Sequence, residues 1–174
     1  MRWALNSSVL VLTIGLILAL TGSARAQDDG GQSHASLKGM FRFSLVKTCT
    51  DAVIGSTTQF YFNGTMVYDG SGSVKLVQQG TLIIPGSTAL VFEEMGELTY
   101  LLKPNGNYLQ EGTIIGTDHS YTVTGARLMG QIDAQGSVLM LSGPIPPERE
   151  TVTSSGGGVS QYVCGASGTA VRLR

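Results

Sequence analysis

The sequence carries little charge. Only 13% of its 174 residues are Asp, Glu, Lys or Arg, and the formal net charge is −1. Removal of an N-terminal leader containing Arg2 and Arg25 lowers the basic count from 11 to 9, against 12 acidic residues. A chain without an excess of Lys and Arg has no electrostatic footprint for nucleic acid, so we expect no nucleic-acid partner. Hydrophobic residues reach 42%, which disfavours intrinsic disorder.

Histidine is scarce as well, with only His34 and His119 in the whole chain. Metal sites need clusters of His, Cys or carboxylate ligands. The sequence has no such cluster, so we expect neither a metal nor a cofactor. Asp118 precedes His119, but no nucleophile motif accompanies this pair, and a turn is the simpler interpretation. We assign no catalytic residue, and a role other than catalysis is favoured.

Cysteine occurs only twice, at Cys49 and Cys164. In an oxidising compartment two such residues are expected to form a disulfide. No His, Lys or Arg directly flanks either residue to lower a thiol pKa, so a reactive thiol is the weaker interpretation. The predicted bond brings the first strand of the mature chain against one of the last, as a closed barrel requires.

Long hydrophobic runs are confined to the N-terminus. A basic start, an apolar run over 9–20 and the small residues before Ala26 have the three parts of a secretory signal peptide. We predict cleavage after Ala26, a secreted or periplasmic protein, and no membrane insertion after cleavage. The polar residues 27–36 are predicted to form a disordered tail.

From Leu37 onward, apolar residues recur with a period of two. Phe41, Phe43 and Leu45 alternate with polar residues, and no helical stripe of ten residues appears outside the leader. Runs typical of strands lie near 39–48, 57–68, 73–84, 88–93, 97–103, 107–116, 119–127, 128–133, 137–142, 159–164 and 169–173. The small acidic group of Glu93, Glu94 and Glu97 is interpreted as a solvent-exposed hairpin turn.

Turn sequences with Asp or Asn and Gly recur about every 30 residues, at Gly72, Gly106 and Gly136. This repetition predicts an all-β fold, an antiparallel up-and-down meander closed into a β-barrel of about 8–10 strands, because closure removes the exposed sheet edges. Residues 37–174 then form a single domain. Residues 143–158 show no strand pattern and are predicted to be a loop, a candidate lid over the mouth of the barrel.

Two segments, Gly39–Phe43 at the opening of the first strand and the hairpin Gly64–Gly72, resemble those of small secreted bacterial calycin-like (lipocalin-type) barrels. Phe41 stands where lipocalins have the Trp of a Gly-x-Trp motif. The resemblance implies a barrel with a cavity for one small apolar ligand.

If such a cavity exists, it is expected to be lined by apolar residues of the predicted strands. The candidate ligand-binding residues are Phe41, Phe43, Leu98, Tyr100, Leu102, Tyr121 and Val123. The same residues equally suit the core of a filled barrel. Lys47 shares the parity of this apolar face, which leaves two interpretations: a side chain that snorkels outward from the strand end, or a cation that reaches a ligand.

Three other functions remain open from the sequence. A barrel-type cyclase or isomerase requires a polar residue, such as Glu111 or Arg42, that points into the cavity with a perturbed pKa. An outer-membrane barrel is disfavoured, because aromatic residues make up only 7% and cannot form two girdles. A structural or interaction module with a filled core would act through its outer face, and no oligomeric state follows from the sequence.

Overall fold

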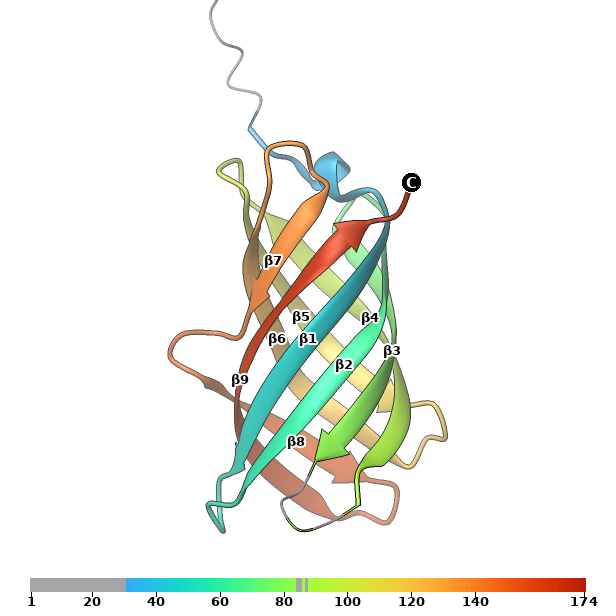
Figure 1. Ribbon diagram of the computed structural model, residues 1–174, viewed down its shortest axis with the longest axis vertical. Helices are drawn as coiled ribbons and strands as arrows, with labels where there is room; N and C mark the ends of the chain where they lie inside the picture. The colour runs from blue at the N-terminus through green and yellow to red at the C-terminus, as the bar shows by residue number, and fades with distance from the viewer. Residues whose placement is uncertain (1–30, 84–85, 87) are drawn as a thin grey trace, which may run out of the picture. The chain divides into compact units, whose positions relative to one another are not determined.

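The computed structural model describes residues 31–83, 86 and 88–174 of the chain (Figure 1). The predicted signal peptide and the first residues of the predicted tail lie outside the described residues. Within the described part, the 3₁₀ helix η1 precedes nine strands. Their bounds are η1 His34–Leu37, β1 Gly39–Asp51, β2 Thr57–Tyr68, β3 Ser73–Ile83, β4 Leu90–Leu102, β5 Asn107–Gly116, β6 Tyr121–Ile132, β7 Val138–Ser142, β8 Glu148–Ser154 and β9 Val159–Arg172.

The strands form one antiparallel up-and-down sheet that closes on itself, as predicted. Each strand from β1 to β6 pairs with the next, and β1 pairs with β9 in continuous register from Phe41–Arg172 to Asp51–Tyr162. The short strands β7 and β8 occupy a single position between β6 and β9, because β7 pairs with one half of each neighbour and β8 with the other half. The barrel therefore has eight strand positions around its circumference.

Several predicted strands merge in the structure. The predicted runs 88–93 and 97–103 form the single strand β4, 119–127 and 128–133 form β6, and 159–164 and 169–173 form β9. Glycines within these strands resemble the glycines of turns in the sequence. Several of them instead allow the backbone of a neighbouring strand to approach closely. A Cβ at Gly130 would lie 1.9 Å from the carbonyl oxygen of Met140 on β7, which only Gly avoids.

The prediction of a loop over 143–158 is wrong in its central part. Glu148–Ser154 forms β8, which leaves only short connections at 143–147 and 155–158. The polar composition of β8 hid the strand, because one face meets solvent and the other carries a charged residue into the lumen. These short connections do not form the predicted lid over the mouth of the barrel.

One end of the barrel is closed. The turns after β2, β4 and β6 lie there, and they are the three turns predicted from the Gly repeat. Gly72, Gly106 and Gly136 all have positive φ, at 120°, 83° and 66°. The carboxylate of Asp69 accepts hydrogen bonds from the Ser71 hydroxyl and from the backbone N–H groups of three residues of its own turn. These bonds, with that of the Ser71 hydroxyl the largest contribution, lower the pKa of Asp69.

Helix η1 plugs this closed end. Leu37 is fully buried within the core, next to the first strand. The Tyr100 hydroxyl donates a hydrogen bond to the His34 carbonyl at 3.1 Å, and the Arg172 guanidinium donates to the Ser36 carbonyl. Residues 32–36 of the predicted tail thus contact the closed end of the barrel, where the backbone N–H of Gln32 also donates to the Pro104 carbonyl.

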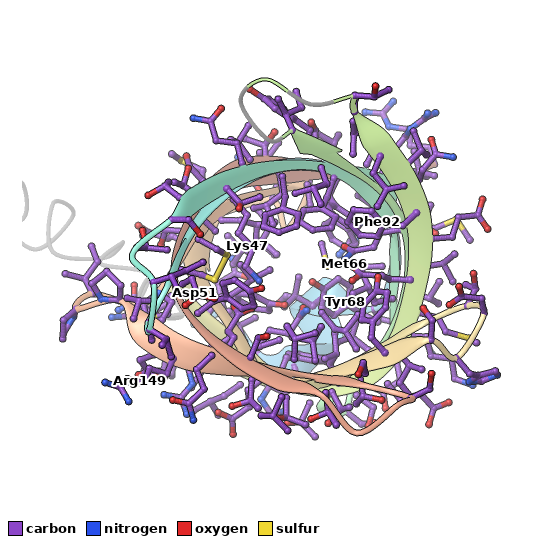
Figure 2. All side chains as sticks on the ribbon, turned by 90° about the horizontal axis from the view of Figure 1, so that it is seen from below. Lys47, Asp51, Met66, Tyr68, Phe92 and Arg149 are labelled. Atoms are coloured by element: carbon purple, nitrogen blue, oxygen red, sulfur yellow. A yellow bond between two sulfur atoms is a disulfide. The ribbon has the colours of Figure 1, made fainter. Side chains whose placement is uncertain are left out.

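Along the strands, side chains point alternately into the core and outward, as the period of two predicted. It is densest in the closed half, where Phe41, Tyr68, Val74 and Leu139 are almost completely buried. Figure 2 looks into the opposite, open end: Lys47, Met66 and Phe92 point into the lumen, and Arg149 points away from it. Among the described residues no helix has the length and apolar character needed to cross a membrane.

Candidate functional site

The open half of the barrel contains a cavity of about 300 Å³. This volume lies at the lower end of the range for small-molecule sites. Apolar side chains from β1 to β6, such as Leu45, Phe62, Leu76 and Ile114, make up most of its lining. Against this apolar background, polar side chains occur in three small groups, one at the floor and two in the walls.

At the floor of the cavity, Gln110 belongs to a hydrogen-bonded group with two tyrosines that lie behind it in the core. The hydroxyls of Tyr68 and Tyr108 form a hydrogen bond of 2.8 Å, and Tyr108 donates its proton to the side-chain oxygen of Gln110, which faces the cavity. Burial raises the pKa of Tyr68 and of Tyr108 well above the ordinary value. Both phenols are therefore neutral at physiological pH, and the group separates the cavity from the packed closed half.

The first polar group of the wall is centred on Glu94. Gln78 lies opposite Glu94 in the register of β3 and β4, and its amide donates to one carboxylate oxygen. Tyr121 on β6 donates its hydroxyl proton to the other oxygen at 2.8 Å. Burial, followed by the negative charge of Glu94, raises the pKa of Tyr121 and keeps its phenol protonated as a donor.

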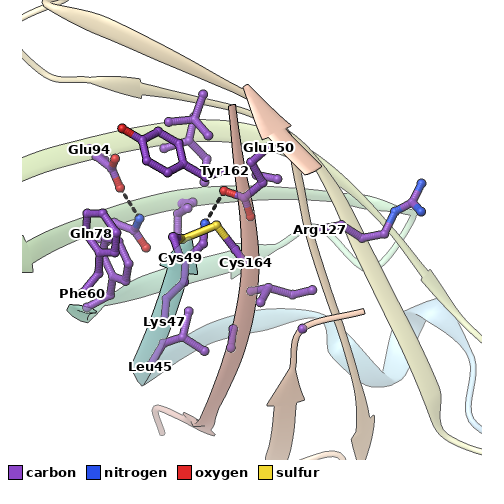
Figure 3. A pocket seen from close by; sticks show the side chains of 18 of the residues that line it. Leu45, Lys47, Cys49, Phe60, Gln78, Glu94, Arg127, Glu150, Tyr162 and Cys164 are labelled. Atoms are coloured by element: carbon purple, nitrogen blue, oxygen red, sulfur yellow. Dashed lines mark hydrogen bonds and ion pairs between the residues drawn. A yellow bond between two sulfur atoms is a disulfide. The ribbon is translucent and has the colours of Figure 1, made fainter. Parts of the chain in front are cut away.

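The second polar group joins Lys47 and Glu150. The Lys47 ammonium on β1 forms a salt bridge to the Glu150 carboxylate on β8, and both side chains are largely buried. Figure 3 shows this pair beside the disulfide and apart from the Gln78–Glu94 contact. Of the two interpretations of Lys47, the inward one fits the structure, with a protein carboxylate as its partner.

The predicted disulfide forms between Cys49 and Cys164. The two residues are directly opposite each other in the β1–β9 register, with Cα atoms 4.1 Å apart. Both side chains point inward and line the cavity (Figure 3). The bond thus fixes the seam between the first and last strands at the level of the candidate site, and a disulfide fits an extracellular or periplasmic location.

The predicted ligand-binding residues separate into two groups. Phe43, Leu98, Tyr121 and Val123 line the cavity. Phe41, Tyr100 and Leu102 are buried in the packed core of the closed half and do not line it. The sequence pattern gives the inward face of each strand, but it does not reveal where along the barrel the filling ends and the cavity begins.

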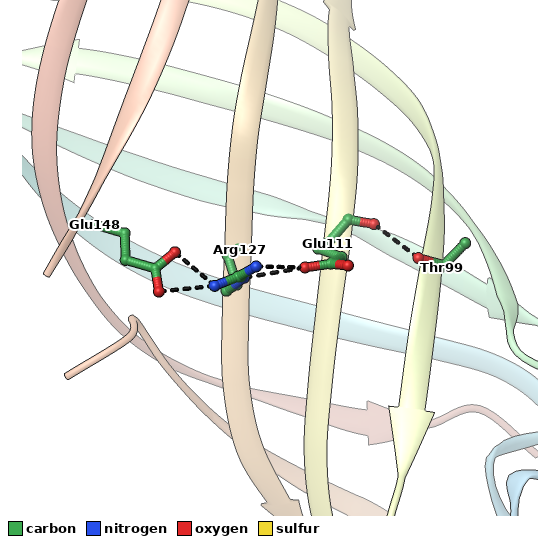
Figure 4. A network of polar contacts seen from close by, with 4 residues as sticks. All are labelled: Thr99, Glu111, Arg127 and Glu148. Atoms are coloured by element: carbon green, nitrogen blue, oxygen red, sulfur yellow. Dashed lines mark hydrogen bonds and ion pairs between the residues drawn. The ribbon is translucent and has the colours of Figure 1, made fainter. Parts of the chain in front are cut away.

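The two residues suggested for an enzymatic role lie outside the lumen. Arg42 is exposed on the outward face of β1. Glu111 faces outward on β5 and pairs with Arg127 on β6, which also binds Glu148 at the start of β8 (Figure 4). This network on the outer surface joins β5, β6 and β8, and its exposed pairs contribute little stability each.

Sequence reasoning placed Lys47 and Tyr121 on the inward face but missed Gln78, Glu94, Gln110 and Glu150, which also line the cavity. Glu94 was assigned to an exposed turn, yet it is only 5% exposed within β4. Its parity was the available signal, because Phe92, Glu94 and Leu98 share one face of the strand. Within residues 31–83, 86 and 88–174, no group of three or more His, Cys, Asp or Glu side chains is arranged to hold a metal ion.

Comparisons with known proteins show only distant similarity. No protein family matches the chain. No curated protein matches it either. The chain is similar to a redesigned β-barrel, mFAP1, bound to DFHBI, with a TM-score of 0.37 and 16% identity over 80% of this chain and 100% of that one. It is also similar to Rv2717c from M. tuberculosis, with a TM-score of 0.32 and 14% identity over 80% of this chain and 94% of that one.

Similarities this distant carry no argument about a ligand. The closed barrel rests on the strand pairing described above, and membership of the lipocalin-type family stays a prediction.

Proposed function

We propose that this protein is a secreted binding protein that holds one small, mainly apolar molecule in the open half of its barrel. The observation that carries the proposal is the cavity of about 300 Å³, which combines an apolar lining with a few convergent polar groups. An eight-stranded barrel either fills its interior with side chains or leaves room for one small ligand. Here the closed half is filled and the open half is not.

Secretion is the second part of the proposal. The leader pattern over 1–26 supports export, and the Cys49–Cys164 disulfide fits an oxidising compartment. N-terminal sequencing of the exported protein tests this part directly. A first residue of Gln27 is the expected result, and a chain that keeps residues 1–26 would contradict it.

Binding is tested with N-phenyl-1-naphthylamine, a neutral apolar dye whose fluorescence rises in apolar surroundings. The test uses two variants on neighbouring residues of β9. Ala166→Phe places a ring in the cavity, whereas Ser167→Phe places the same ring on the exposed outer face. The wild type and Ser167→Phe are expected to bind one dye per chain, and Ala166→Phe at least tenfold more weakly. Equal affinity of both variants would refute the proposal.

A proton-transfer enzyme is the second candidate, because Glu94 is a carboxylate that lines an apolar cavity between two hydrogen-bond donors. Such a site suits an isomerisation or cyclisation of a flexible apolar substrate. Any molecule recovered from the purified protein is incubated with fresh protein and examined by mass spectrometry and chromatography. An isomer formed by wild type but not by Glu94→Gln favours the enzyme, and an unchanged molecule favours binding alone.

A further inference from the structure

Glu94 differs from the other charged side chains that line the cavity. The other charged residues of the lining are Lys47, Glu150 and Arg127, and the guanidinium of Arg127 reaches the outer face. Lys47 pairs with Glu150, and Arg127 pairs with two carboxylates on the outer face. Within the described part of the chain, no Lys, Arg or His nitrogen lies within 4.0 Å of the Glu94 carboxylate. The cavity therefore contains one buried carboxylate without a cationic partner.

The Glu94 carboxylate also has unused capacity for hydrogen bonds. An ionised carboxylate accepts about four hydrogen bonds, and Gln78 and Tyr121 supply one each. Both of these donors are neutral, so they orient the carboxylate without balancing its charge. An unpaired buried charge is unfavourable, and a cation delivered by a ligand would remove this cost.

Aromatic rings surround the same position. Phe92 lies two residues before Glu94 on the same face of β4, and its ring packs edge-on against Phe62 at 5.8 Å and against Tyr121 at 6.4 Å. Phe60 stacks on Phe62 at 5.9 Å. Aromatic faces attract cations and also accept hydrocarbon, so a carboxylate beside such a cluster is suited to the charged end of an amphiphilic amine.

We infer that the ligand is a small apolar amine carrying one positive charge. Its ammonium group binds the Glu94 carboxylate, and its hydrocarbon body lies against Phe62 and Phe92. This inference rests on the proposed binding function and names the ligand class for the same cavity. An apolar carboxylate of equal size is expected to bind more weakly, because it would bring a second negative charge to Glu94.

The inference is tested by isothermal titration with three probes of one chain length: octylammonium, octanol and octanoate. Hydrogen bonds to charged groups are stronger than neutral ones, and the difference corresponds to about a tenfold change in Kd. We expect octylammonium to bind about tenfold more tightly than octanol, and octanoate to bind most weakly. Octanol or octanoate binding as tightly as octylammonium to the wild type would overturn the inference.

Two matched variants test whether Glu94 causes the preference for octylammonium over octanol. Glu94→Gln removes the charge inside the cavity, and Glu93→Gln removes the same charge from the adjacent, exposed position. Glu94→Gln is expected to bind octylammonium and octanol within about twofold of each other, while Glu93→Gln keeps the tenfold preference. A preference that survives Glu94→Gln contradicts the inference. The probe series on the wild type decides the question even if Glu94→Gln fails to fold.

The same titrations distinguish a failure of the proposed binding function from a failure of the amine assignment alone. If neither the three probes nor N-phenyl-1-naphthylamine binds, the proposed binding function itself is refuted. If the dye binds and octylammonium has no advantage over octanol, only the assignment of an amine is refuted.

Discussion

Replacing Leu37 by Ala tests whether η1 closes one end of the barrel. Leu37 is the only apolar residue of η1 with no exposed surface, and it packs into the main core. Leu→Ala changes at fully buried sites cost about 3–5 kcal/mol, depending on how far the site collapses. Because η1 is a single short turn held by hydrogen bonds to Tyr100 and Arg172, it can shift inward and fill part of the space. We expect a cost of about 3 kcal/mol, at the lower end of that range.

This cost is measured by urea unfolding and by calorimetry of the mature protein. For a domain of this size, 3 kcal/mol corresponds to a decrease in Tm of about 10 °C. Leu101→Ala is the matched control, because Leu101 is 47% exposed on the outer face of β4 and should cost less than about 0.5 kcal/mol. If the two variants lose the same stability, Leu37 does not act as a plug, and the assignment of a closed end fails.

Three further predictions concern strand packing, acid stability and the ion pair. Gly130→Ala forces a Cβ against the Met140 carbonyl and should lower stability by about 2–3 kcal/mol in urea, whereas Gly156→Ala, with open space around it, should change little. Because folding lowers the pKa of Asp69, the stability it contributes is present above about pH 4 and is lost as the pH falls further. The Tm of Asp69→Asn should thus fall less between pH 4 and pH 2 than that of wild type, and parallel Tm curves would contradict this. Lys47→Met should cost about 3–5 kcal/mol by leaving Glu150 unpaired, whereas the double variant Lys47→Met with Glu150→Met should approach wild-type stability; additive costs would refute the coupling.

The fold could be predicted because a barrel imposes two simple patterns. The alternation of Phe41, Phe43 and Leu45 marks the inward face of β1, and the turns at Gly106 and Gly136 follow β4 and β6. Both patterns are local in the sequence and depend only on strand geometry and turn chemistry. Their repetition is sufficient to predict antiparallel neighbours, and the Cys49–Cys164 pair indicates which strands close the sheet.

The bounds of the long strands were harder to predict, because one residue type has two roles. In hairpin turns Gly supplies the positive φ, but Gly96 and Gly130 lie within strands, at points where the backbone of a neighbouring strand approaches closely. A single sequence does not distinguish these roles. The strand β8 was missed for a different reason: its inward residue Glu150 is polar, and the partner Lys47 that makes its burial possible lies 103 residues away.

The candidate site was predicted only in part. Strand parity correctly directs Phe43, Leu98 and Val123 toward the lumen, and it also directs Glu94 there. Glu94 was nevertheless interpreted as exposed, because acidic residues are usually exposed. Burial of Glu94 depends on Gln78 and Tyr121, which come from two other strands, so the environment of the carboxylate emerges only when the barrel closes.

Methyl NMR of the mature protein with added N-phenyl-1-naphthylamine shows whether the open half of the lumen is the binding site. Leu45, Leu98 and Ile114 line the cavity, whereas Val77 and Leu101 are exposed on the outer face. We expect the methyl signals of the first three residues to shift in proportion to bound dye and those of Val77 and Leu101 to stay in place. Shifts confined to the outer residues, with the lumen signals unchanged, would contradict it.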